Sequence, residues 1–83
     1  MARLLFFGKL GDIAGGRSRE LTLEPDTKTV MQLVEFIGKI DSALGAALLE
    51  TSVRFIVNEQ IVSPTHSIAN GDEIAFLPPV SGG

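Results

Sequence analysis

The stretch that decides the fold is Thr29-Val30-Met31-Gln32-Leu33-Val34-Glu35-Phe36-Ile37. Its apolar residues recur at the spacing of a single helical face, and they are Val30, Leu33, Val34 and Ile37. Thr29 and Gln32 have the spacing of a capping box, in which a hydroxyl and an amide satisfy backbone N–H groups at the start of a helix. We therefore predict a principal helix that begins after Thr29 and ends near Ile40.

Short apolar segments precede and follow this helix. Before it, residues 3–7 and 18–23 have the length and composition of strands, and the glycine-containing connection between them suggests an antiparallel hairpin with a helical turn at residues 9–14. After it, Asp41 or Ser42 can cap a second, shorter helix that runs to Leu49. Three further strands are predicted at residues 53–58, 60–62 and 73–77, with turns at Asn58-Glu59 and Asn70-Gly71-Asp72.

The order of strand, strand, helix and further strands predicts a two-layer α+β domain. At 83 residues and 8.8 kDa the chain is one domain, which we assign to residues 1–77, followed by an extended tail at residues 78–83. We find no internal repeat or linker in the sequence.

Composition excludes several classes of function. The sequence has no cysteine and one histidine, which excludes a disulfide framework, a zinc knuckle, an iron–sulfur site and a cysteine nucleophile, and we expect no metal site. A net charge of −3 has the wrong sign for a nucleic-acid binder. No apolar run approaches the roughly 20 residues that span a bilayer. The apolar run at the N-terminus is too short for a secretory signal. A cytoplasmic protein without nucleic-acid or membrane partners is expected.

Both faces of the predicted sheet carry large apolar side chains. Because neighbouring residues of a strand point to opposite faces, Leu5 and Phe7 share one face, and Leu4 and Phe6 share the other. One principal helix covers only one face, so apolar groups remain on the other. Such a patch predicts a surface for a protein partner. The alternatives are that the second helix or a loop covers it, or that the sheet coils on itself.

The interior of the sequence shows no catalytic motif. His66 lies in a predicted loop without a positioned carboxylate, and we interpret it as a solvated side chain. Asp72 and Glu73 are adjacent at the start of a strand and point apart, which favours a turn over an acid pair. Gly15-Gly16 lacks the helix and lysine that would follow in a phosphate-binding loop, so a turn is expected there too.

The C-terminal tail is the segment whose residues indicate a chemical function. Pro78-Pro79 favours an extended conformation that holds the following residues away from the sheet. Gly82-Gly83 has no side chains, so it can enter a channel too narrow for any Cβ, and a terminal glycine leaves its carboxylate open to attack. The plainer interpretation is a frayed chain end.

The stretch NGDEIAFLPPVSGG at residues 70–83 resembles the end of the small subunit of molybdopterin synthase, the MoaD family. Leu4-Leu5-Phe6-Phe7 in the first strand and Val57-Asn58-Glu59 are similar to the same family, so the resemblance extends over the whole chain. It implies the ubiquitin-like β-grasp fold, in which a mixed sheet packs on one principal helix. That fold agrees with the element order derived above.

The resemblance also implies a sulfur carrier. A ubiquitin-activating-type adenylyltransferase would adenylate the carboxylate of Gly83 with ATP, and a persulfide donor would convert it to a thiocarboxylate. The tail would then enter the large synthase subunit, in an expected heterotetramer, and deliver sulfur to cyclic pyranopterin monophosphate to form the molybdopterin dithiolene. No stably bound cofactor is expected. The residues implied in tail insertion are Pro78, Pro79, Val80, Ser81 and Gly82, and those in contact with the large subunit are Phe7, Ile61 and Leu77.

The sequence departs from the family pattern near the first strand. Gly8 and Gly11-Asp12 stand where the family commonly has Ala and an Arg-Glu or Arg-Asp pair, which puts in doubt any partner salt bridge of that arginine. Leu77 replaces a frequent Phe. Three alternatives remain: a carrier for another pathway such as thiamine biosynthesis, a ubiquitin-like modifier joined to lysines through Gly83, and an interaction domain with an inert tail.

Overall fold

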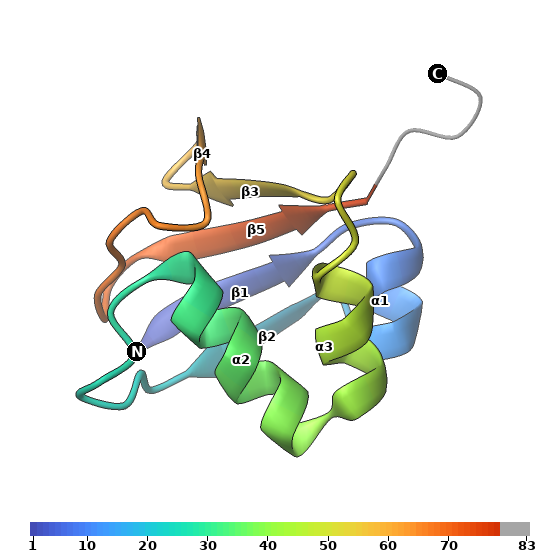
Figure 1. Ribbon diagram of the computed structural model, residues 1–83, viewed down its shortest axis with the longest axis horizontal. Helices are drawn as coiled ribbons and strands as arrows, with labels where there is room; N and C mark the ends of the chain where they lie inside the picture. Colours follow the sequence, from blue (N-terminus) through green and yellow to red (C-terminus); the bar gives the residue numbers. More distant parts are fainter. Residues whose placement is uncertain (79–83) are drawn as a thin grey trace.

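The computed structural model describes residues 1–78 and places them in one sheet with helices packed against it (Figure 1). The strands are β1 (Ala2–Phe6), β2 (Ser18–Leu21), β3 (Arg54–Val57), β4 (Gln60–Val62) and β5 (Glu73–Leu77). The helices are α1 (Lys9–Ala14), α2 (Val30–Ile40) and α3 (Ser42–Leu48). The predicted order of elements is therefore confirmed.

The strand order in the sheet is β2-β1-β5-β3-β4. β1 and β5 pair in parallel at the centre, with Leu4 opposite Ile74, and the other neighbouring strands are antiparallel. β1 and β5 are the first and last strands of the chain, so all the other elements lie in the connection between them. A parallel pair needs a long connection of this kind. The sheet is mixed, and α2 and α3 lie on one of its faces, as the α+β prediction requires (Figure 1).

The principal helix α2 forms for the local reasons expected from its sequence. The Thr29 hydroxyl accepts a hydrogen bond from the Gln32 N–H at 3.2 Å, and the Gln32 side-chain oxygen accepts one from the Thr29 N–H at 3.1 Å, which completes the capping box. α3 begins in a similar way, because Asp41 Oδ1 accepts a hydrogen bond from the Leu44 N–H at 3.1 Å. The stripe of α2 that packs against the sheet is buried, and its members are Val30, Leu33, Val34 and Ile37.

A row of three phenylalanines forms the centre of the core beneath the helices. In the strand register Phe6 of β1 lies opposite Phe76 of β5, and Phe76 lies opposite Phe55 of β3. The rings of Phe6 and Phe76 stack with centroids 5.4 Å apart, and those of Phe55 and Phe76 meet edge to face at 5.9 Å. The row therefore spans the parallel pair of β1 and β5 and the antiparallel pair of β5 and β3.

The turn between β3 and β4 fixes that hairpin to the start of β5. Asn58 and Glu59 both have positive φ, at 49° and 71°, as a two-residue hairpin turn of type I′ requires. The Asn58 side chain accepts a hydrogen bond from the Glu73 N–H at 3.0 Å and donates one to the Asp72 carboxylate at 3.0 Å. Asp72 also accepts from the Ala69 N–H at 2.9 Å, so its predicted role in a turn is confirmed.

Several predicted boundaries shift by one or two residues. β1 begins earlier than predicted, at Ala2, and ends at Phe6. β2 ends at Leu21 instead of residue 23, and β3 ends at Val57 because the left-handed turn begins at Asn58. α3 ends at Leu48, one residue earlier than predicted. Within residues 1–78, no helix is both long and apolar enough to cross a membrane.

Candidate functional site

The face of the sheet opposite α2 and α3 carries an apolar row that crosses four strands. Leu5 of β1 lies opposite Ala75 of β5, and Ala75 lies opposite Ile56 of β3. Ile56 in turn lies opposite Ile61 of β4, whose side chain is 73% exposed. Leu5 and Ile56 are half-buried, although the helices lie on the other side of the sheet (Figure 1). Apart from the buried Ala75, the row is therefore accessible to a partner.

A second row lies at the end of the sheet where β5 leads into the tail. Phe7 follows β1, its N–H donates a hydrogen bond to the Phe76 carbonyl at 3.1 Å, and its side chain is 45% exposed. Leu77 lies opposite Arg54 on β3. An open hollow of about 580 Å³ adjoins this row, and its lining residues are Leu5, Phe7, Gly8, Asp12, Arg17 and Ser18. The apolar members of the two rows together form a surface that we call the outer patch, and they are Leu5, Phe7, Ile56, Ile61, Ala75 and Leu77.

The structure brings the three predicted partner-contact residues, Phe7, Ile61 and Leu77, onto this one face. The alternative in which the second helix covers the face is wrong, because α3 packs with α2 on the other side of the sheet (Figure 1). Sequence reasoning did not select Ile56 and Ala75 as partner-contact residues. Their signal was strand alternation, since each neighbours a core phenylalanine in its strand.

The tail begins directly beside the outer patch. Pro78, the last residue that the structure describes, lies close to Gly8: a Cβ built on Gly8 would lie 3.0 Å from the Pro78 Cγ. Gly8 also has φ +56°, in a region that side-chain-bearing residues rarely adopt. The base of the tail is thus positioned by the segment that follows β1. The predicted tail residues beyond it lie outside the described residues, and they are Pro79, Val80, Ser81, Gly82 and Gly83.

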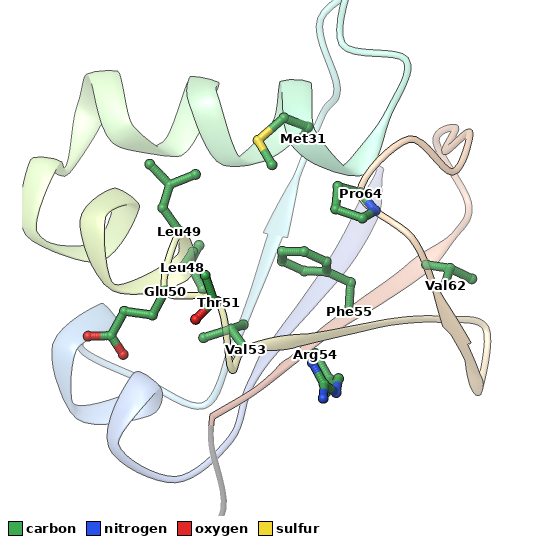
Figure 2. A pocket seen from close by; sticks show the side chains of 10 residues that line it. All are labelled: Met31, Leu48, Leu49, Glu50, Thr51, Val53, Arg54, Phe55, Val62 and Pro64. Atoms are coloured by element: carbon green, nitrogen blue, oxygen red, sulfur yellow. The ribbon is translucent and has the colours of Figure 1, made fainter.

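The other candidates within residues 1–78 offer no reactive centre. His66 is exposed, and no group of three or more His, Cys, Asp or Glu side chains in this part of the chain is placed to hold a metal ion. A second open hollow of about 240 Å³ lies between the helices and β3. Figure 2 shows Met31, Leu49 and Phe55 around it, so its walls are largely apolar.

Comparisons with known proteins identify the family to which the chain belongs. The profile of the ThiS family matches residues 4–83. The chain is 32% identical to the molybdopterin synthase sulfur carrier subunit of Escherichia coli (strain K12), and the match covers 100% of both chains. This chain belongs to the ThiS family. Another relative of this ThiS-family chain, the molybdopterin synthase sulfur carrier subunit of Anopheles gambiae, is 33% identical over 98% of this chain and 90% of the relative.

Solved structures show the same fold. SAMP1 from Haloferax volcanii superposes on this ThiS-family chain with a TM-score of 0.83 at 26% identity, covering 99% of this chain and 98% of the other. A putative molybdopterin converting factor, subunit 1, from Pyrococcus furiosus gives a TM-score of 0.79 at 25% identity, covering 95% and 97%. The ubiquitin-like β-grasp fold is therefore confirmed.

Proposed function

We propose that this chain is the sulfur-carrying subunit of a molybdopterin synthase and that Gly83 is the residue that reacts. The observation that carries the proposal is the match to a molybdopterin synthase sulfur carrier subunit that covers 100% of both chains. The structure supports it with an open apolar patch beside the base of the tail. Activation with ATP would take place in the cytoplasm. The chain itself would need no stably bound cofactor.

The chemistry proceeds through the α-carboxylate of Gly83. An oxygen of this carboxylate attacks the α-phosphate of ATP in the active site of an adenylyltransferase, which releases pyrophosphate and leaves an acyl-adenylate. The terminal sulfur of a protein persulfide then displaces AMP, and a thiol reduces the resulting acyl disulfide to the thiocarboxylate. Glycine suits these steps because it places no Cβ next to the reacting carbon.

Delivery of the sulfur needs a second protein. The large synthase subunit would bind the outer patch and receive the tail, and the thiocarboxylate would transfer sulfur to cyclic pyranopterin monophosphate. Two deliveries would form the dithiolene of molybdopterin. Pro78-Pro79 supports this step because proline restricts the backbone near the tail base and lowers the entropy lost when the tail is inserted.

The outer patch makes the docking step testable. Phe7→Asp places a charge in the patch, and we expect it to weaken binding to the large subunit about tenfold or more, because a buried charge without a partner is costly. Ile40→Asp is the matched control, since Ile40 is 59% exposed at the end of α2, away from this face. Isothermal titration calorimetry measures both affinities. Equal affinities for the two variants would show that the outer patch is not part of the interface.

The proposed modification of Gly83 can be detected because the sequence contains no cysteine. The purified chain is incubated with ATP in an extract of its native host, treated with a thiol-alkylating reagent and analysed by intact-protein mass spectrometry. Alkylation is needed because exchange of oxygen for sulfur changes the mass by nearly the same amount as oxidation of Met1 or Met31. We expect an ATP-dependent adduct that fragmentation places at Gly83.

The extract is controlled with an established sulfur carrier. If that carrier is alkylated and this chain is not, the sulfur-carrier proposal is wrong. The chain could be alkylated at Gly83 and still fail to restore molybdopterin synthesis in a host that lacks its own carrier. That result would favour a carrier for another pathway, such as thiamine biosynthesis.

One observation favours a second candidate function, that of a protein modifier. SAMP1 from Haloferax volcanii, a small archaeal modifier protein, matches with a TM-score of 0.83. In this alternative, Gly83 forms isopeptide bonds with lysines of other proteins. Conjugates that survive boiling and reductant, and that disappear when Gly83 is removed, would support it over a carrier. An interaction domain with an inert tail would show neither conjugates nor the alkylated adduct.

A further inference from the structure

Two exposed arginines lie at the tail end of the sheet, Arg54 on the outer face and Arg17 at the hollow beside Phe7. Arg54 of β3 lies directly opposite Leu77, the last residue of β5. Arg17 lines the hollow beside Phe7, and its carbonyl accepts a hydrogen bond from the Phe6 N–H at 2.8 Å. The order across this end of the sheet is therefore Arg17, Phe7, Leu77 and Arg54. The two cations lie on either side of the apolar pair next to which the tail begins.

The surroundings of these arginines differ from those of Arg3, the other arginine of this face. Arg3 lies in register with Glu20 on one side and Glu73 on the other, so it has an acidic cross-strand neighbour on each side. The residue opposite Arg54 on β5 is apolar. Figure 2 shows the Arg54 side chain on the side of β3 away from the helices. Positive charge is thus available at the tail end of the face, although the whole chain carries a net charge of −3.

Two acidic residues lie near this end. Asp12 lines the same hollow as Arg17, so an acid lies on the same side of the tail base as that cation. Glu50 lines the hollow of Figure 2 together with Arg54, but the two side chains diverge. Arg54 is therefore the less compensated of the two cations, and we expect it to contribute more to binding.

We infer that the protein that receives the tail presents carboxylates on both sides of the opening that admits it, facing Arg17 and Arg54. This inference rests on the proposed function, because it assumes that the outer patch docks on such a protein. Docking removes water from the edge of the patch, and a guanidinium that loses water without gaining an acceptor costs free energy. Carboxylates match the planar donor pattern of arginine. Two such pairs would fix the orientation in which the tail meets its channel.

The test is the association rate with the large synthase subunit, measured by stopped flow at low and high salt. We expect the double variant Arg17→Gln/Arg54→Gln to associate about tenfold more slowly at low salt, because steering by complementary charge raises association rates by about this much or more. At 1 M salt, where the screening length is about 3 Å, the difference should nearly disappear. Arg54→Gln alone should have a larger effect than Arg17→Gln alone.

Two further double variants serve as controls. Lys28→Gln/Lys39→Gln removes the same amount of charge from α2 and the loop before it, and it should associate like the wild type. Arg17→Lys/Arg54→Lys keeps the charge and should restore most of the rate. A wild-type rate in the Arg-to-Gln double variant, or an equal loss in the Lys-to-Gln double variant, would overturn the inference and leave the proposed function intact. A wild-type chain that does not bind the large subunit would overturn both.

Discussion

Removal of Gly83 is expected to abolish sulfur transfer while leaving the domain folded. If the Gly83 carboxylate is the group that is adenylated, the shortened chain offers a serine-glycine end in its place, displaced by one residue from the catalytic atoms. Misplacement by about 1 Å can already cost about a hundredfold in rate, and loss of a full residue shifts the carboxylate by roughly 3.3 Å. We therefore expect molybdopterin formation to fall below detection when measured with purified synthase and cyclic pyranopterin monophosphate.

The matched control for this deletion is His66→Ala. It removes the only imidazole of the sequence, but the described contacts of His66 are made by its backbone, whose carbonyl accepts a hydrogen bond from the Val30 N–H at 3.1 Å. We expect full activity from this variant. Circular dichroism should show that both variants have the wild-type fold. Molybdopterin formation by the chain that lacks Gly83 would contradict the carrier mechanism.

Gly45→Ala is expected to destabilise the domain by forcing α2 and α3 apart. The two helices approach so closely that a Cβ on Gly45 would overlap the Gly38 Cα and lie 3.0 Å from its nitrogen. Because both contacts are with backbone, relief requires the helices to move. Overpacking of this kind costs about 1–3 kcal/mol or more, which exceeds the roughly 1 kcal/mol that alanine gains over glycine in a helix.

Gly38→Ala is the matched control, since it adds the same methyl group to the other side of this contact. A Cβ on Gly38 would lie 3.7 Å from the Gly45 Cα, an ordinary van der Waals distance, so helix propensity should dominate. Thermal unfolding measures both changes, and each 1 kcal/mol shifts Tm by about 4–8 °C in a domain of this size. We expect Tm to fall for Gly45→Ala and to rise for Gly38→Ala. Equal shifts would show that α2 and α3 do not approach as described.

Much of the local structure was predictable from the sequence. α1 and the strands β4 and β5 have the predicted bounds, and the principal helix begins after Thr29 and ends at Ile40. These elements depend on neighbours within a few residues, through the capping box, the helical period and the turn at Asn58-Glu59. Most boundary errors occurred at the ends of strands, and α3 also ended one residue early. β3, for example, ends where its left-handed turn begins.

The candidate site was predictable only in part. Alternation placed Leu5 and Phe7 on one face because successive side chains of a strand point to opposite faces of the sheet. The same rule could not show that Ile61, from the other edge of the sheet, would lie in one row with Leu5. That arrangement required the register of β1, β5, β3 and β4.

The sequence by itself thus determined the type and order of the elements, the two apolar faces of the sheet and the composition of the tail. Tertiary structure decided the parallel pairing of β1 with β5, which places Leu77 beside Phe7 and starts the tail next to Gly8. It also decided the approach of Gly38 to Gly45 and the placement of Arg17 and Arg54 on either side of the tail base. The physical reason is range: helix caps, turns and side-chain alternation follow from adjacent residues, whereas register and helix contact depend on groups far apart in the chain that meet only when the core forms.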